Sequence, residues 1–108
     1  MTSFTNLLFV PANRPERFEK AASSGADLIC IDLEDSVPDD QKNSARDSVF
    51  AALAVLEREK TAVRINGLKT KAGLADLLAM AAADDLPALI FLPMVESASE
   101  VEIVHSIL

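Results

Sequence analysis

Four short apolar runs alternate with segments of helical character, and this alternation constrains the fold more than any other feature of the 108-residue chain. Each run is too short for a helix and is rich in Val, Ile, Leu or Phe. Continuous apolar runs of this kind are typical of strands that are covered on both faces in a parallel sheet. The predicted strands are residues 7–10, 28–33, 62–65 and 89–92.

A segment with helical features follows each predicted strand. The first helix is expected to begin near Asn13, whose side chain would cap it, and the second to span about residues 39–57. The third spans about residues 72–83, and the fourth begins at Ser97 in a capping box. The apolar positions noted in the third helix are Leu74, Leu77, Leu78 and Ala81.

Four strand–helix units in succession call for right-handed parallel connections and leave two folds open. One is an open doubly wound sheet that is complete in itself. The other is half of an eight-stranded (β/α) barrel, which needs about 250 residues. The chain stops inside the fourth helical pattern without a Gly or Pro exit signal. We therefore favour an α/β fold in which residues 1–108 form the first four βα units, the N-terminal half, of a TIM-type barrel domain.

Charge and composition exclude several classes of partner. The chain has 17 acidic and 10 basic residues, a formal charge of −7, which disfavours binding to nucleic acid. No apolar run approaches the ~20 residues of a membrane span, and the N-terminus lacks the pattern of a signal peptide. Cys30 is the single cysteine and lies in an apolar run, as expected for a buried thiol in a cytoplasmic protein.

Polar side chains follow the predicted strands at the end where parallel α/β folds bind ligands. If Val63 faces the helices, strand alternation turns Arg64 and Asn66 into the mouth of the barrel. The same reasoning places Asp32 and Glu34 on the inner face of the preceding strand. The sequence thus predicts a charged cluster at adjacent strand ends.

The pattern leaves the role of this cluster open. Arg64 either forms a salt bridge with Asp32 or Glu34 that holds the barrel together, or grips a substrate carboxylate in a fork geometry. The two acidic side chains could also hold Mg²⁺, directly or through water.

Four motifs in order resemble the citrate lyase β-subunit-like proteins of the HpcH/HpaI aldolase/citrate lyase family. They are LLFVPANRPER at 7–17, IDLEDSVP at 31–38, VRING at 63–67 and LPMVES at 92–97. The resemblance covers nearly the whole chain. It implies a TIM-type barrel that uses Mg²⁺ and catalyses Claisen- or aldol-type carbon–carbon cleavage. Citryl-, malyl- or related acyl-CoA thioesters, or their acyl-carrier counterparts, would give an acyl thioester and a small oxoacid.

The resemblance also implies roles for individual residues. Glu34 and Asp35 would be catalytic groups close to the metal and its waters, Arg64 would bind the substrate, and Lys20 would lie near the thioester-carrying ligand. The enzyme is expected to be a homo-oligomer.

Three departures from the family pattern qualify this assignment. Phe9 stands where many members have Tyr, and Met94 where the family usually has Lys. The family's two direct metal ligands, a Glu and an Asp, come from later strands, so none is expected within residues 1–108. The alternative is therefore a non-catalytic half-barrel subunit or interaction module.

Overall fold

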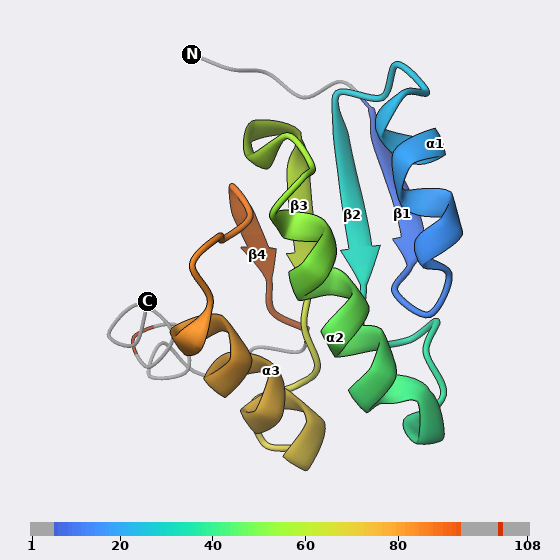
Figure 1. Cartoon of the computed structure of the whole chain (residues 1–108). Helices are drawn as coiled ribbons and strands as arrows, with labels where there is room; N and C mark the ends of the chain where they lie inside the picture. The colour runs from blue at the N-terminus through green and yellow to red at the C-terminus, as the bar shows by residue number, and fades with distance from the viewer. Residues whose placement is uncertain (1–5, 94–101, 103–108) are drawn as a thin grey trace.

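A computed structural model describes residues 6–93 and 102, which form a parallel four-stranded sheet with three α-helices (Figure 1). Each predicted strand is confirmed to within one residue at either end. The strands are β1 (Leu7–Pro11), β2 (Leu28–Asp32), β3 (Thr61–Arg64) and β4 (Leu89–Phe91). The helices are α1 (Phe18–Ala22), α2 (Lys42–Leu53) and α3 (Lys71–Ala82), with 3₁₀ turns η1 (Pro15–Arg17), η2 (Asp39–Gln41) and η3 (Arg58–Lys60).

The strand order distinguishes between the two folds. The order is β1-β2-β3-β4 and every neighbouring pair is parallel. A doubly wound sheet reverses its strand order at a switch point and carries helices on both faces. Here each strand is added at the same edge, and α1, α2 and α3 lie on one face (Figure 1). This is the arrangement of successive βα units in a TIM-type barrel, and the structure contains four strands of it.

The main apolar core lies between the sheet and the three helices. Alternate strand residues point into it, as the sequence predicts from the period-two geometry of strands. Its buried members include Val10, Ile29, Ile31 and Val63 from the strands and Phe18, Val49, Leu53 and Met80 from the helices.

The opposite face of the sheet is also apolar. Leu28, Cys30 and Ala62 form a small buried cluster there, against which Phe91 packs. Their partners in the strand register, Leu7, Phe9 and Leu89, share this face and are 41%, 49% and 39% exposed. In a closed barrel this face is the interior, where apolar side chains belong.

The beginning of the first helix differs from the prediction. The side chain of Asn13 does not cap a helix; its Nδ2 donates instead to Oε1 of Gln41 at 2.6 Å, in the turn before α2. The chain passes through η1 and becomes α-helical only at Phe18. The predicted second helix is shorter than expected, because α2 ends at Leu53.

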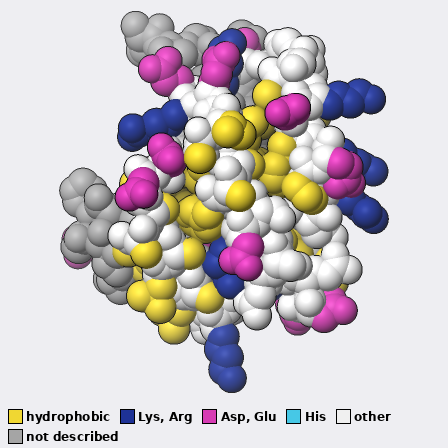
Figure 2. All heavy atoms as spheres, viewed as in Figure 1, with side chains coloured by type: hydrophobic (Ala, Val, Ile, Leu, Met, Phe, Trp, Pro, Cys, Tyr) yellow, Lys and Arg dark blue, Asp and Glu magenta, His cyan; other side chains and the backbone are white. Residues whose placement is uncertain are grey.

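The third helix exposes part of its apolar sequence and buries a charged residue. Thr70 caps it, with Oγ1 accepting from the Gly73 amide at 3.0 Å. Leu74 and Leu78, two of the apolar positions noted in the sequence, are 54% and 69% exposed. Apolar side chains gather over α3 at the lower left of Figure 2. The residues that α3 does bury are Gly73, Asp76, Leu77 and Met80.

Two further expectations concern residues that the structure does not describe. The helix predicted from Ser97 and the departure at Met94 lie outside the described residues. Within those residues, no helix has the length and apolar character that a bilayer crossing requires.

Candidate functional site at the carboxyl ends of the strands

Asp32 and Arg64 end adjacent strands and lie opposite each other in the register of β2 and β3. Their side chains form a two-point ion pair, with Nε of Arg64 2.9 Å from Oδ1 of Asp32 and Nη2 2.8 Å from Oδ2. The guanidinium carbon also lies 5.3 Å from the ring centroid of Phe9 on β1, within the range of a cation–π contact. Of the two roles left open for Arg64, the structure therefore contains the salt bridge.

The Asp32 carboxylate also organises the turn that follows β2. Oδ1 accepts from the Glu34 amide at 2.9 Å, and Oδ2 accepts from the amide and hydroxyl of Ser36 at 3.1 and 2.8 Å. Burial opposes ionisation of this carboxyl. The hydrogen bonds from Arg64, Glu34 and Ser36 outweigh that effect and lower the pKa of Asp32 to about 2. With its oxygens engaged in this way, Asp32 is poorly suited to bind a metal directly.

Glu34 and Asp35 complete the cluster around Arg64. Oε1 of Glu34 lies 3.7 Å from Nε of Arg64, and Oδ2 of Asp35 lies 3.9 Å from Nη2. Burial and the charges of Asp35 and Asp32 raise the pKa of Glu34, against the lowering effect of Arg64 and Lys42. The Asp35 side chain is 78% exposed and reaches solvent. Three of the four predicted site residues, Glu34, Asp35 and Arg64, are thus brought together.

Arg64 carries a permanent positive charge in this setting. Its hydrogen bonds with Asp32, and the nearby charges of Glu34 and Asp35, raise its pKa although partial burial opposes the shift. The Asp32 ion pair uses Nε and Nη2, whereas a guanidinium has five N–H donors. The group is therefore fixed in place and retains donors for a further anionic or carbonyl oxygen.

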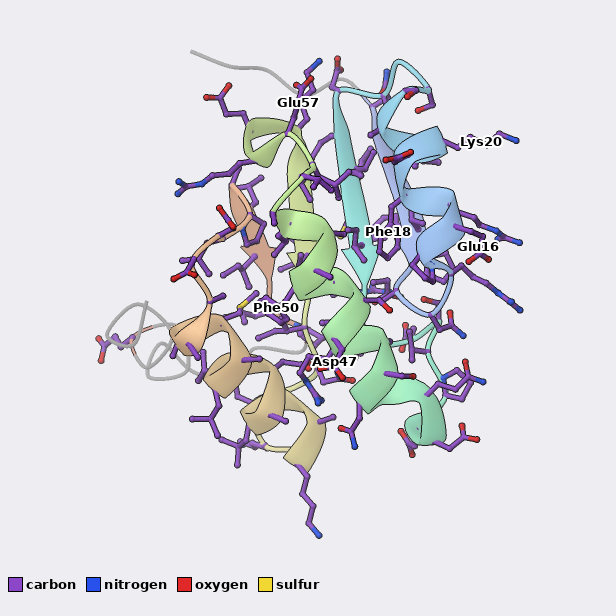
Figure 3. The ribbon with its side chains drawn as sticks, in the orientation of Figure 1. Glu16, Phe18, Lys20, Asp47, Phe50 and Glu57 are labelled. Carbon is purple, nitrogen blue, oxygen red and sulfur yellow. The ribbon has the colours of Figure 1, made fainter. Side chains whose placement is uncertain are left out.

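Lys20 lies apart from this cluster. It is exposed on α1 and, in Figure 3, its side chain extends outward, away from the sheet. It lines a groove of about 490 Å³ between α1 and the free edge of β1, together with Phe9, Pro11 and Arg17. Phe9 lines this groove and also lies under the Arg64 guanidinium.

Asn66 does not enter the mouth of the barrel, so this prediction was wrong. Strand β3 ends at Arg64, and two residues later the chain has turned Asn66 toward the helices, where it is buried. Its main-chain amide and Nδ2 donate to Oδ2 of Asp76 at 2.9 and 2.7 Å. Its Oδ1 accepts from Nζ of Lys42 at 2.6 Å.

A buried polar network on the helix side of the sheet was not predicted from the sequence. Asp76 on α3 is fully buried, and its Oδ1 accepts from Nε of Arg46 on α2 at 2.7 Å. Each ion is compensated by the other and by hydrogen bonds, which a buried charge requires. The signal was present in the sequence: Asp76 is the single charged residue between Ala72 and Ala83.

The acidic residues here suit contacts to the water around a cation better than direct ligation. Among residues 6–93 and 102, no group of three or more His, Cys, Asp or Glu side chains is arranged to hold a metal ion. Glu34 and Asp35 present carboxylates beside Arg64, and Mg²⁺ commonly keeps several waters that such groups can accept from. These two carboxylates are therefore placed to accept hydrogen bonds from the waters of a bound cation.

Proteins of known name are similar to this chain in sequence. An L-malyl-CoA/beta-methylmalyl-CoA lyase of Cereibacter sphaeroides is 51% identical over 65 residues, covering 58% of this chain and 20% of that protein. A (3S)-malyl-CoA thioesterase of Cereibacter sphaeroides is 35% identical over 97% of this chain and 37% of its own length. The chain thus spans well under half the length of these relatives.

A solved structure has the same arrangement of elements. It is CitE from Mycobacterium tuberculosis in complex with magnesium, acetoacetate and coenzyme A. The two proteins are 40% identical and superpose with a TM-score of 0.81, over 94% of this chain and 37% of that one. The family model for HpcH/HpaI aldolase/citrate lyase matches residues 5–108. This chain belongs to the HpcH/HpaI aldolase/citrate lyase family.

Proposed function

We propose that this chain is part of a Mg²⁺-dependent carbon–carbon lyase that cleaves a malyl-, citryl- or related acyl-CoA thioester to an acyl thioester and an oxoacid. The observation that carries the proposal is the Arg64 guanidinium, held by Asp32 with Glu34 and Asp35 within 4 Å, at the carboxyl end of a barrel sheet. Active sites of such barrels lie at this end. The lyase among the relatives and the CoA-bound structure support the same reaction class.

Arg64 would bind the oxygen groups of the substrate. Its pairing with Asp32 fixes the guanidinium plane before substrate arrives, so little side-chain entropy is lost on binding. A fixed cation beside the reacting carbonyl stabilises negative charge as it develops on oxygen in the transition state. The cation–π contact with Phe9 restricts the same group from the β1 side.

Glu34 and Asp35 would act on water and protons near the reacting atoms. Asp35 is open to solvent, and the raised pKa of Glu34 favours its protonated form more than that of an ordinary glutamate. When bound, Mg²⁺ would supply Lewis-acid polarisation of the oxoacid carbonyl. Its direct ligands are expected outside residues 1–108. Lys20 is proposed to contact the thioester-carrying ligand from the groove beside β1.

The proposal includes the setting of the enzyme. Residues 1–108 would be the N-terminal half of the barrel domain, in a homo-oligomeric protein of the cytoplasm. The free, buried thiol of Cys30 suits a reducing compartment. The alternative, a half-barrel subunit without catalysis, is supported by the lack of a metal-binding group among the described residues.

Product analysis of the full-length gene product separates these functions. We expect incubation with malyl-CoA or citryl-CoA and Mg²⁺ to release acetyl-CoA with glyoxylate or oxaloacetate, and EDTA to stop the release. Free CoA and malate, without glyoxylate, would replace the lyase with a thioesterase. No turnover of either thioester would favour the non-catalytic module.

A further inference from the structure

We infer that Lys42 is a positioning residue for the proposed reaction: it fixes the backbone that carries Glu34 and ties it to the segment after Arg64. The inference rests on the proposed function for its catalytic consequence. Lys42 is the first residue of α2, on the helix side of the sheet. Its Nζ donates to the main-chain oxygens of Leu33 and Glu34 at 3.0 and 2.9 Å and to Oδ1 of Asn66 at 2.6 Å.

These contacts use the full donor capacity of an ammonium group, which has three N–H bonds and no acceptor. The carbonyls of Leu33 and Glu34 belong to the two peptide units on either side of the Glu34 Cα atom. Holding both carbonyls fixes both peptide planes and therefore the direction of the Glu34 side chain. From the other side, Oδ1 of Asp32 accepts the Glu34 amide at 2.9 Å. The backbone at Glu34 is thus held between Asp32 and Lys42.

The third acceptor of Lys42 is itself rigidly placed. Asn66 donates twice to the buried carboxylate of Asp76, which also accepts from Arg46. Asn66 follows Arg64 by two residues, so Lys42 connects the turn after β2 to the segment after β3. The Asp32–Arg64 pair makes the corresponding connection on the inner side of the sheet.

This arrangement has a direct consequence for the site. The gap between Glu34 Oε1 and Arg64 Nε is 3.7 Å, a distance that a small rotation of either peptide unit would change. Misplacing a catalytic group by about 1 Å costs up to about 100-fold in rate. Loss of Lys42 should therefore reduce turnover without removing any group proposed to touch the substrate.

The experiment compares Lys42→Met with Lys71→Met in the full-length gene product. Lys71 is an exposed lysine at the start of α3. Like Lys42, it lines a groove between α2 and α3, so it is a matched control for the loss of one charge. We expect Lys42→Met to lower kcat for malyl-CoA cleavage by at least about 10-fold with KM within about twofold of wild type. Lys71→Met should leave both constants unchanged.

Amide hydrogen exchange gives a readout that does not depend on activity. In Lys42→Met, the Glu34 and Ser36 amides should exchange at least about 10-fold faster, while strand amides at Ile31 and Val63 keep wild-type rates. If Lys42→Met does not fold, Lys42→Gln, which retains two donors, is measured in its place. Unchanged exchange at Glu34 and Ser36, or wild-type kcat, would overturn the inference. An inactive wild-type protein would refute the proposed function alone, because exchange would still report on Lys42.

Discussion

Asp32 and Arg64 face each other across β2 and β3, and their two-point ion pair links the carboxyl ends of these two strands. The same carboxylate that fixes the guanidinium also accepts the amides of Glu34 and Ser36. One buried group therefore controls both the position of the cation and the shape of the acidic turn beside it. Substitution of Asp32 should therefore affect both the stability of the fold and the proposed activity.

The first prediction concerns Asp32 and pH. Because its pKa is lowered from 3.8 to about 2, the ionised carboxylate stabilises the folded state at pH values above about 4. This contribution is lost as the pH falls from about 4 through 2, and it amounts to about 2 kcal/mol. Asp32→Asn should lower the free energy of unfolding at pH 6 by about this amount, and the difference from wild type should shrink toward pH 2.

Urea unfolding of both proteins at a series of pH values measures this difference. Asp47→Asn is the control, because Asp47 is exposed on α2 and labelled in Figure 3. A constant difference between wild type and Asp32→Asn across the whole pH series would contradict the assignment.

Gly73 should not tolerate a methyl group. A Cβ atom at this position would overlap the main-chain carbonyl of Gly67, because the first turn of α3 passes directly over that residue. Gly→Ala in a helix normally stabilises by up to about 1 kcal/mol, but overpacking here should destabilise by about 1–3 kcal/mol. Gly67→Ala is the matched control, since its Cβ would meet nothing nearer than 4.0 Å. A melting temperature of Gly73→Ala equal to or above that of wild type would show that Gly73 does not pack against the Gly67 carbonyl.

Cys30 should be chemically inert in the folded protein. Burial, followed by the charge of Asp32, raises its thiol pKa to about 12, so almost no thiolate exists at pH 8. Iodoacetamide labelling followed by mass spectrometry should be at least about 100-fold slower for native than for guanidinium-unfolded protein. Equal labelling rates in the two states would mean that the inner face of the sheet opens readily.

Residues 1–108 expressed by themselves should associate. The inner face of the sheet exposes Leu7, Phe9 and Leu89, and on the helix side α3 exposes Leu74 and Leu78. Contiguous exposed apolar patches commonly mark surfaces that associate. Light scattering at micromolar concentration should therefore give a mass well above 11.6 kDa. A monomer with a sharp unfolding transition would instead show that the open sheet is self-sufficient.

The strands and their faces could be predicted because apolar runs and period-two alternation are local signals. Helix boundaries were less predictable. Asn13 has the residue type of a cap but hydrogen-bonds Gln41, a contact 28 positions away that no local pattern contains. The face that α3 buries includes Asp76, whose partners Arg46 and Asn66 come from other parts of the chain. Tertiary polar contacts override helical periodicity there.

The site shows the same division. The grouping of Glu34 and Asp35 with Arg64 follows from parallel strands ending at one edge, and it was predicted. Asn66 was misplaced because the alternation was extended beyond the last residue of β3. The contribution of Lys42 could not be anticipated, since a lysine at the start of a helix normally extends into solvent, and its three acceptors are set by the fold.

The most direct test of the account is the kcat/KM of Arg64→Ala in the full-length gene product, measured as oxoacid release from malyl-CoA and citryl-CoA with Mg²⁺. Arg58→Ala is the control, because Arg58 is an exposed arginine in η3, before β3 and at the opposite end of the sheet. We predict a loss of at least about 100-fold for Arg64→Ala, the scale of losing one positioned charge contact, and wild-type values for Arg58→Ala. Near-normal turnover by folded Arg64→Ala would contradict the central role of the Asp32–Arg64 cluster.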